Sequence, residues 1–384
     1  MLRAESLALF EEDGRALRDP AQVIPLPSVA PFAVGDRLAH RVRGDFWGLL
    51  ERLGIRLLVT REYEHLLLSL GVSTSGRPDV SWLPLPHPSG VAVDRRTGHV
   101  TVALTRNPNQ LLTLTARQGA EHSAARGVLL PASTTFFPGA TYLHDLAYIG
   151  NRLHATAVGK NHVAEVRSDG SLAPSWWPAI MDRDGGPDTR RNWLQLNSIA
   201  AGASLDDSFF TASTRRRLRY PPGHMRFAAD RQGVVYSGRT RDVMASGLTR
   251  PHSARLDGTS LWVDDSGYGT VGVIQDGVYA PVRKLPGWTR GLTIHANVAF
   301  VGTSRLLPAF AHYAPGVRKA TCGIHAIDTS SGATLASITW PMGNQIFAIE
   351  WIGAGQTAGL PYNRARSAQT AQLRDLFYSD SNWE

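Results

Sequence analysis

The sequence predicts an all-β protein: a six-bladed β-propeller whose ring is closed by N-terminal strands that complete the last blade. Three observations predict this fold. A strand-start motif occurs six times, its copies have the spacing of propeller blades, and the last copy lacks strands that are present at the other end of the chain. The 384 residues include 37 glycines and 23 prolines, which suits a fold of short strands joined by tight turns.

The repeated motif is one mostly polar position followed by a short β-forming run. Its six copies are SGVAV, HDLAY, NSIAA, HSARL, RGLTI and FAIEW, which begin at Ser89, His144, Asn197, His252, Arg290 and Phe347. Successive copies begin 55, 53, 55, 38 and 57 residues apart. A four-stranded propeller blade takes roughly 40–55 residues. Six copies therefore predict six blades.

The last blade indicates how the ring closes. After the run FAIEWIG the chain continues as a polar tail, but three further strand-like runs stand near the N-terminus, at residues 55–60, 65–70 and 80–85. If these runs complete the blade begun at Phe347, no sheet edge is left open. We therefore expect an N-terminal arm with a short amphipathic helix over residues 1–54, a propeller over 55–355 and a C-terminal tail over 356–384.

The repeat predicts which residues meet in space. The first strand of a propeller blade lines the central channel, so the six motif starts should form a ring at one channel mouth. The residues two positions upstream should form a second tier: His87, Tyr142, Gln195, Arg250, Trp288 and Gln345. Residues far apart in the sequence thus become neighbours around one axis.

This ring contains groups that carry chemistry. His144 and His252, with His87, could bind a divalent transition metal, because imidazole suits Zn, Cu, Fe and Ni. Without a metal, His144 and His252 could act as acid–base groups. Arg290 is a fixed positive charge suited to a substrate carboxylate or a developing oxyanion. The alternative is a channel lined by polar side chains that bind only water.

Four further residues are candidates for substrate binding beside Arg290. Asn197 and Gln345 offer neutral amide groups, and Tyr142 and Trp288 could form apolar walls. The motif starts include no acid, so a hard cation such as Ca²⁺ is disfavoured at the ring relative to a metal that prefers imidazole.

Charge and cysteine content narrow the classes of partner. The formal net charge is +8, but the arginines are scattered and lack interleaved aromatic residues, so we do not expect nucleic acid as the partner. One cysteine, Cys322, excludes an intrachain disulfide and favours a reducing compartment. No signal peptide is recognisable and no run approaches the ~20 apolar residues of a membrane span. We expect a cytoplasmic protein without a membrane partner.

Several segments resemble the serial motifs of a bacterial family known only as conserved hypothetical proteins. They are YLHDLAYIG, LQLNSIAAG, GLTRPHSARLDGTSLWVDDSGYGTVG, LPGWTRGLTIHANVAFVGTSR and CGIHAIDTSSG. The resemblance covers roughly residues 45–355 and implies a six-bladed propeller, with no reaction attached. This chain departs from the family pattern at Gln195, where the family usually has histidine, and at Gln345, where an acid is usual. Those departures imply altered chemistry if the family residues are ligands or acid–base groups.

Two functional hypotheses follow. The first is an enzyme, a hydrolase, lyase or modifying enzyme, that acts on a small molecule or peptide with an anionic group at the channel mouth. Its catalytic residues would be His144, His252 and Arg290. The second is a propeller scaffold that binds a protein or peptide without catalysis, as many propellers do. The sequence leaves the substrate and the oligomeric state open.

Overall fold

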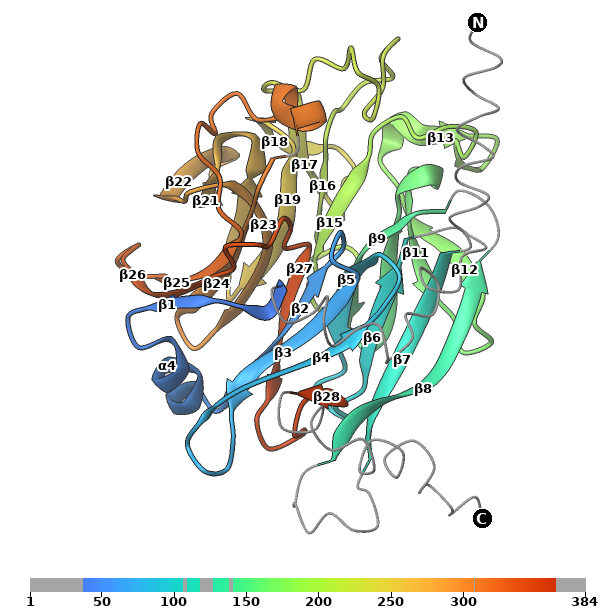
Figure 1. The fold of residues 1–384 in the computed structure, drawn as a ribbon. Coiled ribbons are helices and arrows are strands. Elements are labelled where there is room, and N and C mark those ends of the chain that lie inside the picture. Colours follow the sequence, from blue (N-terminus) through green and yellow to red (C-terminus); the bar gives the residue numbers. More distant parts are fainter. Residues whose placement is uncertain (1–36, 106–108, 118–126, 138–140, 307, 364–384) are drawn as a thin grey trace, which may run out of the picture.

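Six β-sheets stand around a central axis in the computed structural model, which describes residues 37–105, 109–117, 127–137, 141–306 and 308–363 (Figure 1). Each sheet has four neighbouring, hydrogen-bonded strands, and two sheets gain a fifth strand at the outer edge. The predicted six-bladed β-propeller is confirmed. The N-terminal arm before residue 37 and the tail after residue 363 lie outside the described residues, and the domain boundaries predicted there stay predictions.

The blades follow one another along the chain, and we number them from the first complete one. Blade one is β5 (Pro88–Val93), β6 (Val100–Leu104), β7 (Asn109–Arg117) and β8 (Val128–Phe137). Blade two is β9 (Leu143–Ile149), β10 (Arg152–Ala157), β11 (His162–Val166) and β12 (Leu172–Trp176). Blade three is β15 (Leu196–Ala200), β16 (Phe209–Ala212), β17 (Gly233–Ser237) and β18 (Val243–Leu248). Blade four is β19 (Pro251–Asp257), β20 (Ser260–Asp265), β21 (Thr270–Gln275) and β22 (Val278–Lys284).

The last two blades carry the additional strands. Blade five is β23 (Trp288–His295), β24 (Val298–Ser304), β25 (Gly323–Asp328) and β26 (Thr334–Thr339), extended by β1 (Arg41–Arg43). Blade six is β27 (Ala348–Gly353), β2 (Ile55–Arg61), β3 (Leu66–Val72) and β4 (Pro78–Pro84), extended by β28 (Tyr362–Asn363). A short hairpin, β13 (Asp182–Arg183) and β14 (Gly186–Pro187), lies between blades two and three.

Closure of the ring occurs as the sequence predicts, by pairing of the C-terminal strand with an N-terminal one. β27 pairs antiparallel with β2 over six residue pairs, from Ile55 with Gly353 to Thr60 with Ala348. The hydroxyl of Thr60 donates to the carbonyl of Ser89 in blade one at 2.6 Å. Blade six is therefore joined both within its own sheet and to the neighbouring blade.

The predicted amphipathic helix is also present, as α4 (Phe46–Leu53). The Asp45 side chain caps its first turn by accepting from the Gly48 amide at 3.0 Å, and Gly54 ends it in the left-handed conformation, as is common at helix C-termini. Its buried residues, Phe46, Leu49 and Leu50, pack in the hydrophobic cluster that lies under blades five and six. No helix among the described residues combines the length and apolar character that a membrane crossing needs.

A β-bulge recurs near the start of five of the six innermost strands. The pairing register slips at Ser89–Gly90, His144–Asp145, Asn197, Ser253–Ala254 and Arg290–Gly291. A bulge bends its strand and redirects side chains, and bulges are frequent beside functional sites. These bulges lie at or next to the repeated polar position, so they help to set the direction of the ring side chains.

Candidate functional site

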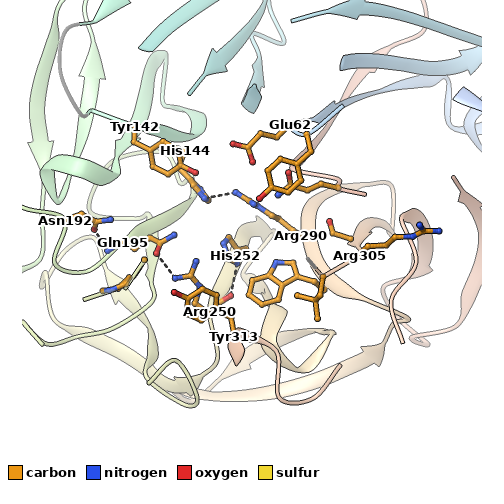
Figure 2. A pocket seen from close by; sticks show the side chains of 17 residues that line it. Glu62, Tyr142, His144, Asn192, Gln195, Arg250, His252, Arg290, Arg305 and Tyr313 are labelled. Carbon is orange, nitrogen blue, oxygen red and sulfur yellow. Dashed lines mark hydrogen bonds between the residues drawn. The ribbon is translucent and has the colours of Figure 1, made fainter. Parts of the chain in front are cut away.

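The face of the propeller that carries the repeated polar positions contains a pocket of about 330 Å³. Its floor and walls come from the starts of innermost strands, as predicted, and from the turns between second and third strands, which reach the same face. Figure 2 shows the lining side chains directed toward a common centre from several blades. Volumes of 300–1,000 Å³ are typical of small-molecule sites.

His144 and Arg290 meet across the channel axis. His144 belongs to blade two and Arg290 to blade five, which stand opposite each other in a ring of six. Nη2 of Arg290 donates to Nε2 of His144 at 2.7 Å, as the dashed line in Figure 2 shows. A guanidinium has no acceptor, so Nε2 carries the lone pair, and Nδ1–H of the neutral ring donates to the Asn197 carbonyl at 2.7 Å. Both ring nitrogens of His144 are thus engaged.

His252 lies against His144 but keeps one nitrogen available. The two rings are stacked, with centroids 5.6 Å apart and planes at 27°. Nδ1 of His252 lies 2.7 Å from the carbonyl of Arg250 and 2.9 Å from the hydroxyl of Ser266. The carbonyl can only accept, so Nδ1 carries the proton. Nε2 is therefore a lone pair that makes no hydrogen bond within the described part of the chain, and His252 lines the pocket.

Arg250 is a second buried cation in the same pocket. Its Nη1 donates to Oε1 of Gln195 at 2.6 Å, and its guanidinium carbon lies 4.7 Å from the ring centre of Tyr313. The backbone of Arg250 is left-handed, as it is at His87, Tyr142 and Gln195. Four of the six second-tier residues thus adopt a conformation that is uncommon for residues other than glycine.

Gln345 joins Arg290 to a carboxylate that lies one side chain further away. With its amide nitrogen toward Glu62, Gln345 donates to Glu62 Oε2 at 3.1 Å and accepts from Arg290 Nη1 at 2.9 Å. Glu62 is 7% exposed and also accepts from the hydroxyl of Thr105 at 3.2 Å. A hydrogen-bonded chain therefore runs from Glu62 through Gln345 and Arg290 to His144.

The electrostatics of the pocket follow from burial next to two arginines. Burial, reinforced by the charge of Arg290, holds the pKa of His144 and of His252 well below the usual histidine value. Both rings are thus neutral at physiological pH. Burial also lowers the pKa of Arg250 to about 10 and lowers that of Arg290, so both arginines stay charged.

The two arginines differ from the other buried arginines of the described chain. The buried Arg56 and Arg61 each pair with a carboxylate, at 2.7 and 3.1 Å, and the partly buried Arg255 pairs with Asp145 at 3.0 Å. Arg250 and Arg290 are each 8% exposed, and within the described residues neither forms an ion pair. The Nε–H of each is buried without an acceptor there, as is that of Arg61. Buried cations are normally paired, so an anionic ligand would complete this pocket.

The structure brings most of the predicted residues together. His144, His252, Arg290, Tyr142, Trp288 and Gln345 all line the pocket. Tyr142 and Trp288 form aromatic walls as expected: the Tyr142 ring meets His144 edge-on at 5.7 Å, and the Trp288 ring meets His252 in the same manner at 5.7 Å.

Asn197 and His87 lie apart from the pocket. The Asn197 amide donates to the carbonyl of Pro251 at 2.7 Å, so this residue positions neighbouring strands and, through its own carbonyl, His144. His87 packs edge-on against His65 at 4.4 Å, with Nδ1 3.8 Å from Glu62 Oε1. Neither residue is part of the pocket lining.

The three histidines predicted as metal ligands do not form a donor set that fits a cation. His144 has no free nitrogen, His87 lies outside the pocket, and Arg290 places a positive charge beside the rings. No group of three or more histidine, cysteine, aspartate or glutamate side chains in the described part of the chain is arranged to hold a metal ion. This arrangement does not support the metal hypothesis.

Two charged residues of the pocket lining, Arg250 and Glu62, had no predicted role. Arg250 was placed in the second tier without a role, and its signal was its position two residues before His252. Glu62 lies outside the repeated motif, so the motif did not predict it. It stands in the turn after β2 and lines the pocket at the channel mouth.

The fold and the site define a class: a six-bladed β-propeller with a cationic, histidine-containing pocket at one mouth of its channel. The chain belongs to a family described as a domain of unknown function (DUF4915), whose model matches residues 44–359. The predicted membership in a family of unknown function is thus confirmed. No curated protein matches the sequence.

Solved structures with the same fold are distant in sequence. A chain of the nidogen/laminin complex is 11% identical with a TM-score of 0.51, and the match covers 79% of this chain and all of that one. A gluconolactonase from Xanthomonas campestris is 14% identical with a TM-score of 0.46, covering 79% and 86%. A calcium-binding regucalcin from Agrobacterium tumefaciens is 12% identical with a TM-score of 0.42, covering 65% and 73%. At these identities the likeness concerns the fold alone.

Proposed function

We propose that the protein is an enzyme that binds a small molecule or peptide through an anionic group in the channel-mouth pocket and transfers a proton with His252. One observation carries the proposal: Arg250 and Arg290 are buried without a carboxylate partner, beside a neutral histidine whose Nε2 is free. Arg250 and Arg290 would hold the anionic group of the substrate.

Anion binding is favoured by the unpaired donors of the two arginines. Arg290 donates one N–H to His144 and one to Gln345, and Arg250 donates one to Gln195. The remaining donors include two Nε–H groups that are buried without acceptors. A buried donor without a partner destabilises the protein by about 1–3 kcal/mol. Ligand oxygens that accept from these N–H groups would remove that destabilisation. A planar guanidinium also matches carboxylate and phosphate oxygens in a bidentate manner.

Proton transfer is assigned to His252 because of its available lone pair. Its pKa is low because the ring is buried and lies near the charge of Arg290. A bound anion would offset that charge and raise the pKa toward the physiological range. His252 would then serve as a general base, with Nδ1–H held by the Arg250 carbonyl and Ser266. Hydrolysis, elimination and group modification all include such a proton transfer.

The role of His144 differs in this proposal from the one expected from the sequence. Its Nε2 receives the hydrogen bond from Arg290 and its Nδ1 is bound to Asn197. His144 would therefore fix the guanidinium of Arg290 in the pocket and would touch the substrate through its ring face. We assign it as a positioning residue.

The test combines binding with turnover. We would measure binding of benzoate and phenyl phosphate by calorimetry, and turnover of a panel of anionic esters, amides and lactones, for the wild type and for Arg250→Gln, Arg290→Gln and His252→Gln. The arginine variants should lose binding, and His252→Gln should keep binding while losing turnover.

A matched control is His154→Gln, the same substitution at a buried histidine of blade two outside the pocket. Anion binding that survives loss of both arginines would contradict the proposal. A protein or peptide partner retained by the double variant His144→Gln, His252→Gln, with no turnover of any substrate, would favour the scaffold hypothesis.

A further inference from the structure

The net charge of the whole pocket lining restricts the class of ligand more narrowly than the two buried arginines do. The lining includes three arginines, Arg250, Arg290 and Arg305, and one glutamate, Glu62. Three positive charges and one negative charge leave a net charge of +2. Arg305 stands at the exposed rim, whereas Arg250 and Arg290 are buried.

Neutral amides occupy the positions where carboxylates would balance the two buried arginines. Gln195 accepts from Arg250, and Gln345 accepts from Arg290 and donates to Glu62. Elsewhere in the described chain buried arginines contact carboxylates directly, as Arg56 contacts Asp79 at 2.7 Å. An amide satisfies one N–H of a guanidinium but leaves its charge uncompensated, which is costly away from water.

We propose that the pocket takes a small phosphomonoester, with the phosphate dianion between Arg250 and Arg290 and the organic part along Tyr63, Tyr142 and Trp288. This inference rests on the proposed function and names the substrate class of the same site. A phosphate monoester carries about −1.5 to −2 charges at neutral pH, which matches the net charge of the lining. Its three terminal oxygens supply acceptors for two guanidinium groups at once.

The size and shape of the site favour a small molecule over a phosphorylated protein. The pocket holds about 330 Å³. Pro222 and Gly223 from the β16–β17 loop and Leu306 and Tyr313 from the β24–β25 loop extend its walls above the buried floor. The Tyr313 hydroxyl donates to the His224 carbonyl at 3.3 Å, so these two loops contact each other beside the mouth. Figure 2 shows Tyr313 next to Arg250 on that side of the pocket.

Two probes of the same shape and different charge test the inference. Phenyl phosphate is mostly a dianion at about pH 7.5, because its second pKa is near 6, whereas phenyl sulfate stays a monoanion. By calorimetry at about pH 7.5 we expect phenyl phosphate to bind at least about tenfold more tightly, which corresponds to about 1.4 kcal/mol. At about pH 5 phenyl phosphate is a monoanion too, and the two affinities should converge.

Charge-adding variants provide the second test. Gln195→Glu places a carboxylate against Arg250 with little change in side-chain shape, so the variant should fold at least as well as the wild type. It should bind phenyl phosphate at least about tenfold more weakly and change phenyl sulfate binding less. Gln275→Glu adds the same charge at an exposed position at the end of β21 and should leave both affinities unchanged.

Equal affinity for the two probes at about pH 7.5, or binding of neither at millimolar concentration, overturns the phosphomonoester assignment. In either case benzoate separates the two proposals. If benzoate binds and Arg290→Gln abolishes that binding, the anion site of the proposed function stands, and only the assignment of a dianionic ligand fails. If neither phenyl phosphate, phenyl sulfate nor benzoate binds, both proposals fail.

Discussion

Arg290 of blade five donates a hydrogen bond to His144 of blade two across the channel axis, over 2.7 Å. The bond joins opposite sides of the propeller and forms part of the pocket floor. It fixes the tautomer of the histidine and one edge of the guanidinium at once. His144 is therefore best understood through Arg290, and the following predictions begin from this pair.

Removing the acceptor on His144 should disturb Arg290 more than it disturbs His252. In His144→Phe, Nη2 of Arg290 loses its acceptor, and anion binding should weaken about tenfold because a charged hydrogen bond contributes about 1.5–3 kcal/mol. His144→Gln offers an amide oxygen in place of Nε2 and should recover most of the affinity. Calorimetry with benzoate compares the variants, and equal affinities for the phenylalanine variant and the wild type would refute the positioning role.

Arg250 should lower the free energy of unfolding of the protein without a bound anion. It is buried without a carboxylate, so Arg250→Met removes a desolvated charge and retains much of the side-chain volume. Replacing buried charges by well-packed apolar groups is often neutral or stabilising by about 1–4 kcal/mol. Urea unfolding should show unchanged or increased stability, together with loss of anion binding. A large loss of stability would show that Arg250 serves the fold.

Acid should destabilise the protein through its buried neutral histidines. The pKa values of His144 and His252 are lower in the folded state than the ordinary value of 6.5. Below about pH 6.5 the unfolded chain binds protons that the folded chain does not, so stability falls as pH falls, by up to about 1.4 kcal/mol per pH unit for each histidine.

The measurement is urea unfolding at several pH values between about 7.5 and 5.5, where unperturbed histidines begin to titrate. His144→Gln, His252→Gln should flatten the dependence. It should not remove it, because burial also lowers the pKa of His154, His162 and His325. A double variant with an unaltered slope would contradict the assignment of these two pKa values.

Asp264 should lower the free energy of unfolding at neutral pH. It is fully buried, and burial raises its pKa well above 3.8. A raised folded-state pKa contributes stability below the unfolded value that is lost as pH rises. Asp264→Asn should therefore increase the unfolding free energy at pH 7 and have a smaller effect near pH 4. Asp276→Asn, at the exposed β21–β22 turn, is the control, and an equal effect at both pH values would contradict the prediction.

The sequence was sufficient for the architecture because a propeller is periodic. Six motif starts predicted six blades, and the missing strands after Phe347 predicted the pairing of β27 with β2. The same periodicity predicted that His144, His252 and Arg290 would converge, since equivalent positions of successive blades surround one axis. Even the aromatic walls, Tyr142 and Trp288, followed from their place two residues upstream.

Tertiary structure decided the chemistry, because side-chain direction and pairing do not follow from blade spacing. Bulges and left-handed turns direct each side chain separately, which turned His87 toward His65 and left Asn197 behind His144. Glu62 enters the site from a turn that the motif does not include. From the sequence alone, every arginine counts equally as one positive charge. Only the packed structure distinguishes Arg255, paired with Asp145, from Arg250 and Arg290, whose hydrogen-bond acceptors are neutral side chains.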